Sequence, residues 1–193
     1  MPPRMIVVAA PPGGGKSSIF PVSGFGVSYF NADDRAAELN HGSYAGISKD
    51  IRVTVNREFE AFVQGCIERR TSFAIETTLR SNVTFDQAAR AKAAGFTTEM
   101  RYLALRDFAM HVERVKVRAD AGGHSASEGT LLSIYRSSLA NLARAIAEMD
   151  DLWVYDNSPV GGPPRLVLEA ENGEIRFLVD DPPDCLRTAL DVA

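Results

Sequence analysis

Residues 5–17 read Met-Ile-Val-Val-Ala-Ala-Pro-Pro-Gly-Gly-Gly-Lys-Ser, and this segment is the most informative part of the sequence. Its apolar first half is short and β-branched in the middle, which predicts a strand buried on both faces. Pro11 and Pro12 end that strand, because proline lacks the N–H group that a sheet requires. Three glycines then provide flexible backbone before Lys16, and Pro21 leaves room for only one or two helical turns.

A buried strand, a glycine-rich turn and a helix start, in that order, are typical of a phosphate-binding loop. The Walker A pattern requires a glycine, four free positions and then Gly-Lys-Ser/Thr, and here Ala10 replaces the leading glycine. This replacement is tolerable only if Ala10 does not need a positive φ angle. We expect main-chain amides to bind nucleotide phosphates, Lys16 to offset their charge and Ser17 to bind Mg²⁺. The predicted ATP-binding residues are Pro12, Gly13, Gly14, Gly15, Lys16, Ser17 and Ser18. The alternative is a plain glycine turn with a solvated lysine.

Beyond this loop, helix and strand patterns alternate as far as residue 155. The predicted helices are 51–66, 85–94, 108–118 and 135–149, and the further predicted strands are 27–31, 73–75, 100–105 and 152–155. Asn172-Gly173 predicts a hairpin between strands 166–168 and 175–179. We therefore expect an α/β fold of the P-loop NTPase, kinase type: a doubly wound, mainly parallel sheet flanked by helices, with a C-terminal β-hairpin.

Length and composition favour one domain spanning 1–193, with a core at about 5–158 and an appended hairpin and short helix at about 165–190. The hydrophobic fraction of 45% and the charged fraction of 24% exclude a disordered chain. A net charge of −4 argues against a nucleic-acid partner. Cys66 and Cys185 lie far apart without metal-ligand spacing, so we expect two reduced thiols. The apolar run near the N-terminus is too short for a signal peptide or membrane span, which predicts a cytoplasmic protein without membrane contact.

Polar residues at the ends of the next strands are candidates for the chemistry, because ligands of such sheets gather at the carboxyl ends of strands. Asp33, in the segment 31–35, can accept the proton of an attacking hydroxyl, whereas the alternative is that Asp33 or Asp34 only caps a helix. The segment Glu76-Thr77-Thr78-Leu79-Arg80 offers a carboxylate, two hydroxyls and a guanidinium, which suit sugar hydroxyls or phosphates. Its alternative is that Thr77 or Ser81 caps the following helix.

Basic residues on the predicted helix 108–118 form the third cluster. Arg114 and Arg118 lie one turn apart, and both can stabilise charge on the transferred phosphoryl group. The competing interpretation is a solvated basic helix face. His41 and His111 have no evident partner in the sequence, and we assign them no role.

The chain resembles the zeta-toxin family of P-loop kinases, whose characterised members phosphorylate the amino sugar of UDP-N-acetylglucosamine with ATP and Mg²⁺. The resemblance spans about residues 5–158. The ordered matches after the loop are Asn31-Ala32-Asp33-Asp34-Arg35, Ala74-Ile75-Glu76-Thr77-Thr78-Leu79, Gly95-Phe96 into 102–105, Glu113-Arg114-Val115, Gly122-Gly123-His124, Ser138-Leu139-Ala140-Asn141-Leu142 and Tyr155-Asp156-Asn157-Ser158.

The resemblance implies roles for several of the matched residues. Asp33 is the expected catalytic base, Lys16 and Ser17 hold phosphate and Mg²⁺, and Arg114 clamps phosphate. Glu76 and Thr78 would contact the sugar nucleotide, and Glu60 matches a further acidic contact of some members. The predicted acceptor-binding residues also include Arg35, Thr77 and Arg80. Glu60 is also consistent with a solvent-facing helix residue. Segment 131–134 lacks the expected arginines, which leaves Arg136 as the nearest candidate or Arg118 as a substitute.

Three functions are consistent with these features. The first is an ATP- and Mg²⁺-dependent phosphotransferase acting on a hydroxyl of a small metabolite, with a nucleotide sugar such as UDP-N-acetylglucosamine favoured by the resemblance. The second is a kinase of the same fold with another acceptor, such as an antibiotic or a sugar acid. The third is a nucleotide-binding module that no longer transfers phosphate and acts through a partner. An antitoxin-like protein covering the cleft is a candidate partner.

Overall fold

The computed structural model describes residues 1–120, 126–159 and 161–190. Its strands form one sheet in the order β2-β3-β1-β4-β5-β6-β7. The strands are β1 (Arg4–Ala9), β2 (Ser28–Phe30), β3 (Phe73–Thr77), β4 (Thr97–Ala104), β5 (Asp151–Asp156), β6 (Arg165–Glu171) and β7 (Glu174–Leu178). Strands β1 to β5 pair in parallel, and β6 and β7 add an antiparallel hairpin. The predicted mainly parallel sheet with its terminal hairpin is confirmed.

The helices follow the predicted order, and capping side chains mark the starts of α2, α3 and α6. They are α1 (Lys16–Ile19), the 3-10 helix η1 (Val22–Phe25), α2 (Ala32–Leu39), α3 (Lys49–Glu68), α4 (Val83–Ala93), α5 (Phe108–Asp120), α6 (Glu128–Glu148) and α7 (Asp184–Leu190). Ser48 caps α3 by accepting from the N–H of Ile51, and Ser127 caps α6 by accepting from the N–H of Thr130. Both helices therefore begin before the first apolar residue of the pattern that predicted them. The residues 122–124 singled out in the sequence lie outside the described part of the chain.

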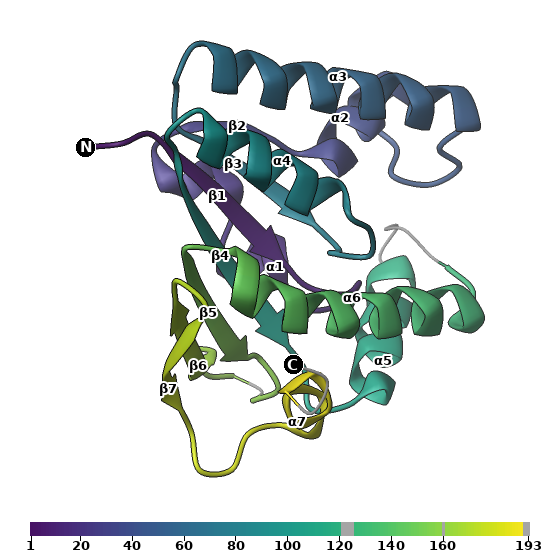
Figure 1. The fold of residues 1–193 in the computed structure, drawn as a ribbon. Helices are drawn as coiled ribbons and strands as arrows, with labels where there is room; N and C mark the ends of the chain where they lie inside the picture. The colour runs from purple at the N-terminus through teal and green to yellow at the C-terminus, as the bar shows by residue number, and fades with distance from the viewer. Residues whose placement is uncertain (121–125, 160, 191–193) are drawn as a thin grey trace.

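The two faces of the sheet are covered unequally. Helices α3, α4, α6 and α7 pack against one face, where they form the largest apolar cluster with β1, β3, β4 and β5, and Figure 1 shows α4 and α6 crossing in front of the strands. On the other face, a smaller apolar cluster joins Ile6, Val8 and Ala74 to residues of η1 and to Phe20, just past α1. Beside them the guanidinium of Arg101 stacks between the rings of Phe25 and Trp153, at 5.0 and 4.9 Å. The doubly wound arrangement therefore has one heavily and one lightly covered face.

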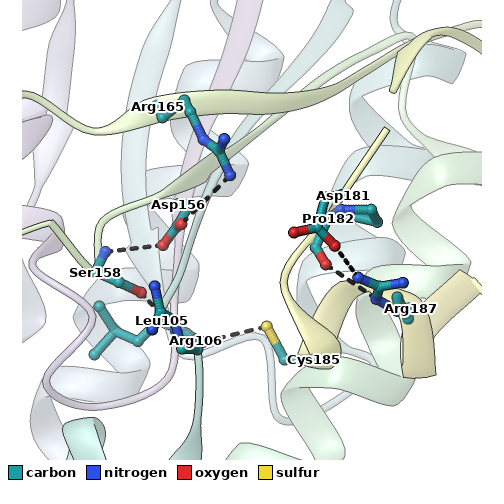
Figure 2. Close-up of polar contacts among 9 residues, drawn as sticks. All are labelled: Leu105, Arg106, Asp156, Ser158, Arg165, Asp181, Pro182, Cys185 and Arg187. Carbon is teal, nitrogen blue, oxygen red and sulfur yellow. Dashed lines mark hydrogen bonds and ion pairs between the residues drawn. The ribbon is translucent and has the colours of Figure 1, made fainter. Parts of the chain in front are cut away.

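Strand β6 of the C-terminal hairpin and α7 share the main apolar core, whereas β7 is exposed along its whole length. Val167 and Leu168 of β6 and Leu186 of α7 are fully buried in this core. Figure 2 shows Cys185 of α7 beside Leu105, just past β4, where its thiol donates to the Leu105 carbonyl over 3.2 Å. In the same view, the Ser158 hydroxyl accepts from the N–H of Arg106 at 2.6 Å. The final segment thus supports the strand ends that carry the candidate site.

Both cysteines are buried and reduced, as the sequence predicts. Among the helices of the described residues, none combines the length and the apolar character needed to cross a membrane.

Candidate active site

The glycine-rich segment between β1 and α1 forms a loop with unpaired N–H groups. Gly13 and Gly15 have φ angles of 80° and 94°, a conformation that favours glycine. Within the described residues, the main-chain N–H groups of Gly13, Gly15, Lys16 and Ser17 make no hydrogen bond, whereas Gly14 donates to the Pro11 carbonyl at 3.0 Å. Unpaired amides at a helix N-terminus are what an anionic phosphate requires. The loop therefore has the backbone chemistry that the sequence predicts.

The residue at the missing glycine position fits without strain. Ala10 is fully buried and is not among the residues with positive φ, so the condition stated for it is met. A Cβ atom on Gly14 would lie 2.5 Å from the Ala10 Cβ and 3.0 Å from the Pro11 carbonyl oxygen. The methyl group of Ala10 therefore occupies space that only a glycine at position 14 leaves open.

Three side chains hold this loop from behind. His111 of α5 lies with Nδ1 2.9 Å from the Pro12 carbonyl oxygen, and the Asn157 amide donates to the Gly14 carbonyl at 3.0 Å. Arg114 in turn donates to the Asn157 carbonyl at 2.8 Å. The sequence assigned no role to His111 or Asn157, although Asn157 follows β5 directly, which is where ligand-binding residues of such sheets are expected.

Lys16 and Glu76 place opposite charges beside the loop. The ammonium group of Lys16 donates to the Ala10 carbonyl at 3.3 Å. Burial lowers the pKa of Lys16, while the carboxylates of Glu76 and Asp33 oppose that shift. Burial also raises the pKa of Glu76, against the influence of Lys16 and Ser17. A further partner of opposite charge would therefore stabilise the charged form of each group: an anion for Lys16 and a cation for Glu76.

The Ser17 hydroxyl and the Glu76 carboxylate form a donor set that fits Mg²⁺. Ser17 Oγ donates to Glu76 Oε2 at 3.2 Å, while Glu76 Oε1 is buried without a hydrogen-bond partner in the described structure. Magnesium in kinases is held by one or two protein oxygens together with phosphates and waters. No cluster of three or more His, Cys, Asp or Glu side chains that could hold a metal alone occurs in residues 1–120, 126–159 and 161–190. The site therefore suits a cation that arrives with a phosphate ligand.

Two cavities meet at these charged residues. The phosphate cavity, of about 630 Å³, is lined by the loop together with Tyr44, Arg114, Arg118 and Asn157. The acceptor cavity, of about 530 Å³, is lined by residues of α3, β3, α4 and the loop between β3 and α4. The residues common to both linings are Lys16, Asn31, Asp33 and Glu76. A group bound in one cavity therefore lies next to a group bound in the other.

Asp33 lines both cavities because another residue caps its helix. The Asn31 side chain accepts from the N–H groups of Asp33 at 3.0 Å and Asp34 at 3.2 Å. The alternative that Asp33 or Asp34 caps α2 is therefore wrong. Asp34 instead accepts a hydrogen bond from the hydroxyl of Tyr44 at 2.9 Å, which leaves the Asp33 carboxylate to face the shared wall.

The strand-end segment 76–80 lines the acceptor cavity as expected. Thr78 and Arg80 face it, and Thr77 Oγ1 accepts from the N–H of Leu79 at 3.0 Å, where the chain turns. The cap position of α4 is Asn82, so the alternative cap by Thr77 or Ser81 is wrong. Glu60 also lines this cavity, although Arg90 and Gln87 bind its carboxylate. The cavity further contains Asn56, Phe59 and Thr84, which the sequence did not single out.

A few predicted site residues line neither cavity. Arg35 forms ion pairs with the carboxylates of Glu58 at 2.7 Å and Glu38 at 2.9 Å. The pair with Glu58 joins α2 to α3, and Arg35 lines neither cavity. Pro12 and Gly14 belong to the loop, but their carbonyls face His111 and Asn157 and accept the hydrogen bonds that support it. The remaining predicted residues are brought together at the two cavities, and their catalytic and binding roles stay predictions. Arg136 is also absent from both linings.

Comparison with known proteins supports the fold. No family model and no curated protein matches the sequence. Among solved structures, a chain of the AvrRxo1-ORF1:-ORF2 complex with ATP matches 91% of this chain at a TM-score of 0.66 and 15% identity. A chain of the PezAT toxin-antitoxin system of Streptococcus pneumoniae matches 98% of this chain and 83% of its own length, at a TM-score of 0.67 and 14% identity.

A third match links the fold to kinases. A proposed kinase from Chloroflexus aurantiacus J-10-fl matches 69% of this chain and 75% of its own length, at a TM-score of 0.54 and 17% identity. The chain spans only 60% of the matched AvrRxo1 complex chain. At these identities the comparisons show the fold. The chain therefore has a P-loop, kinase-type α/β fold, the fold that its resemblance to the zeta-toxin family implies.

Proposed function

We propose that the protein is an ATP-dependent phosphotransferase that moves the γ-phosphoryl group of ATP to a hydroxyl of a small metabolite. One observation carries this proposal: the Asp33 carboxylate lies on the wall common to two cavities, beside Lys16 and Glu76. One cavity is built around unpaired main-chain amides and the other around hydroxyls, carboxylates and an arginine. A transfer reaction requires a donor site and an acceptor site that meet in this way.

The phosphate cavity would hold the ATP phosphates. The free amides of Gly13, Gly15, Lys16 and Ser17 would contact phosphate oxygens, and the Lys16 ammonium would exchange its weak contact to Ala10 for them. Arg114 and Arg118 line the same cavity from α5 and would offset charge on the transferred group. Support comes from the AvrRxo1-ORF1:-ORF2 complex, which was solved with ATP and of which one chain has a similar fold.

Mg²⁺ would be held by the Ser17 hydroxyl and the Glu76 carboxylate together with phosphate oxygens. The bound ion would neutralise charge on the phosphates. The unpaired Glu76 Oε1 supports this assignment, because a buried carboxylate oxygen without a partner is costly.

Asp33 would act as the general base. The acceptor hydroxyl oxygen attacks the γ-phosphorus while its proton passes to the Asp33 carboxylate, and the bond from that phosphorus to the β–γ bridging oxygen breaks. The electron pair of the broken bond stays on the departing ADP. Asn31 makes this role possible, because its side chain caps α2 and the Asp33 carboxylate is not used as the helix cap.

The acceptor is proposed to carry hydroxyls and an anionic group. Thr78 offers a hydroxyl, and Arg80 has no ion-pair or hydrogen-bond partner within the described chain, so it is available to an anion. A nucleotide sugar such as UDP-N-acetylglucosamine combines both features, and the resemblance to the zeta-toxin family supports it. An antibiotic or a sugar acid is the alternative acceptor.

Mass spectrometry of a metabolite extract tests the proposal. The protein is incubated with ATP, Mg²⁺ and the extract, and the expected result is one class of metabolite that gains the mass of one phosphoryl group. Lys16→Ala and Asp33→Asn should each remove the product, whereas Asp86→Asn, an exposed aspartate on α4, should not. Tight ATP binding without any product would instead support a nucleotide-binding module that acts through a partner, and a covering antitoxin-like protein would be sought next.

A further inference from the structure

The loop glycines need an external constraint on their peptide planes. Gly13 and Gly15 both have positive φ angles, and Gly14 lies between them. Glycine has access to many backbone conformations, so peptide units in such a run can rotate at little cost. A phosphate-binding loop, in contrast, needs its N–H groups to point to one side.

Two hydrogen bonds fix alternate peptide planes of this run. In a trans peptide the C=O group of one residue and the N–H group of the next point in opposite directions. The Pro12 carbonyl faces His111 and the Gly14 carbonyl faces Asn157, over 2.9 and 3.0 Å. The N–H groups of Gly13 and Gly15 must therefore point away from α5 and β5, and both glycines line the phosphate cavity.

Hydrogen-bonding chemistry shows which ring nitrogen of His111 donates to the loop. The Pro12 carbonyl can only accept, so Nδ1 of His111 must carry the proton. Its other nitrogen, Nε2, is buried without a partner in the described structure, and the ring packs 5.2 Å from that of Tyr135. His111 is 2% exposed. An apolar side chain would fill this site without leaving a buried nitrogen unpaired, so the hydrogen bond to Pro12 accounts for a histidine here.

Packing supports the same contact. A Cβ atom on Gly13 would lie 2.8 Å from the carbonyl oxygen of His111, and one on Gly15 would lie 2.5 Å from the Asn157 amide nitrogen. The loop therefore lies directly against the two residues that hold it. Neither residue could move away without opening a gap behind the glycines.

We propose that His111, together with Asn157, is a positioning residue that locks the loop peptides so that the Gly13 and Gly15 amides face the ATP phosphates. The proposal rests on the proposed function. His111 acts only through the Pro12 peptide, whereas Asn157 also lines the cavity.

A matched set of His111 variants tests the lock. His111→Asn keeps an N–H donor close to the position of Nδ1, His111→Gln moves the donor one bond further out, and His111→Leu removes it. Binding of ATP with Mg²⁺ is measured by calorimetry. We expect His111→Asn to stay within about threefold of the wild type, and His111→Gln and His111→Leu to bind roughly tenfold or more weakly. In turnover assays the KM for ATP should rise while the KM for the acceptor stays unchanged.

A control separates positioning from general stability. Ser138→Ala removes a buried hydrogen bond to Tyr102 of 2.9 Å, away from both cavities. This variant should unfold more easily but bind ATP as the wild type does. Equal binding by all His111 variants, or equal loss in His111→Asn and His111→Leu, would overturn the lock.

A second measurement needs no nucleotide. In ¹⁵N NMR spectra the Gly13 and Gly15 amides should each give one sharp signal in the wild type and in His111→Asn, and broadened or doubled signals in His111→Leu and His111→Gln. Sharp single signals in every variant would contradict the proposal. If the wild type bound no ATP, the proposed function would fail, whereas the NMR signals would still decide on the lock.

Discussion

The phosphate cavity and the acceptor cavity share a wall but are built in different ways. The phosphate cavity depends on main-chain amides of one short segment, held by side chains of α5 and of the end of β5. The acceptor cavity is lined by side chains from five separate elements, and ion pairs such as that of Glu60 with Arg90 fix part of its surface. A main-chain site is therefore sensitive to added atoms, and a side-chain site to the chemical groups that it contains.

The largest expected effect lies on the shared wall. Asp33→Asn removes the proposed base and should lower kcat roughly 10²- to 10⁴-fold. The dissociation constant of ATP should stay nearly unchanged, because the loop amides are untouched. Calorimetry and steady-state kinetics on the same preparation measure both values. If turnover remained normal, Asp33 would not be the base, and the two cavities would need another link.

An added methyl group should damage the phosphate cavity rather than the acceptor cavity. Gly14→Ala places a Cβ atom 2.5 Å from that of Ala10, which should weaken ATP binding at least roughly tenfold and destabilise the fold by about 1–3 kcal/mol. Ala10→Gly combined with Gly14→Ala should recover part of both losses. Recovery should stay incomplete, because the new atom still lies 3.0 Å from the Pro11 carbonyl. ATP titration and thermal unfolding of the single and double variants test this, and wild-type behaviour of Gly14→Ala would contradict it.

Acid should destabilise the fold through His111, which supports the phosphate cavity. Burial lowers the pKa of His111 to about 4; the carbonyl of Pro12 and the Asp107 carboxylate oppose this shift, and the charges of Arg114 and Lys16 add to it. The Tyr135 ring beside it stays neutral in this range. The unfolded chain, with a histidine pKa near 6.5, binds more protons below that pH, so the free energy of unfolding should fall between about pH 6.5 and 4.

At the acid end of this range, the decrease in the free energy of unfolding due to His111 should approach about 3 kcal/mol. Urea unfolding of the wild type and of His111→Asn at several pH values measures it as the difference between their slopes. Parallel slopes would show that His111 does not remain neutral in the fold.

The smallest effect is expected in the acceptor cavity. Glu60→Gln breaks a half-exposed ion pair with Arg90, so the free energy of unfolding should change by about 0–1 kcal/mol. ATP affinity should not change, and the KM for the acceptor should rise at most a few fold, since Gln keeps an oxygen at this position. Steady-state kinetics with the identified acceptor check this. A loss of turnover comparable to that of Asp33→Asn would place Glu60 in the chemistry.

The contrast between the cavities also explains what the sequence could predict. The loop could be read because its strand, glycines and Lys16 are contiguous and each has a local physical reason. Asp33 and the segment 76–80 could be found because strand ends converge in a parallel sheet. The helix cap at Asn31 was missed because Asn, Asp33 and Asp34 are all good capping residues, and only the structure shows which side chain accepts.

Contacts between distant segments could not be predicted. The hydrogen bond from His111 to Pro12 joins residues 99 positions apart, and that from Asn157 to Gly14 spans 143. The pairing of Arg35 with Glu58 likewise depends on how α2 packs on α3. A signal existed only for Asn157, which follows a strand directly. The sequence contained no such signal for His111, because no sequence pattern predicts which carbonyl a buried histidine will hydrogen-bond.

The placement of α7 limits how far this protein can be trimmed. Among the described residues, none beyond Asn157 lines either cavity. Yet β6 is the neighbour of β5, and Cys185 rests on the carbonyl of Leu105, just past β4. A shortened chain that kept every cavity-lining residue would therefore lose the elements that pack beside the end of β5. Asn157 would then be less well positioned to donate its hydrogen bond to Gly14.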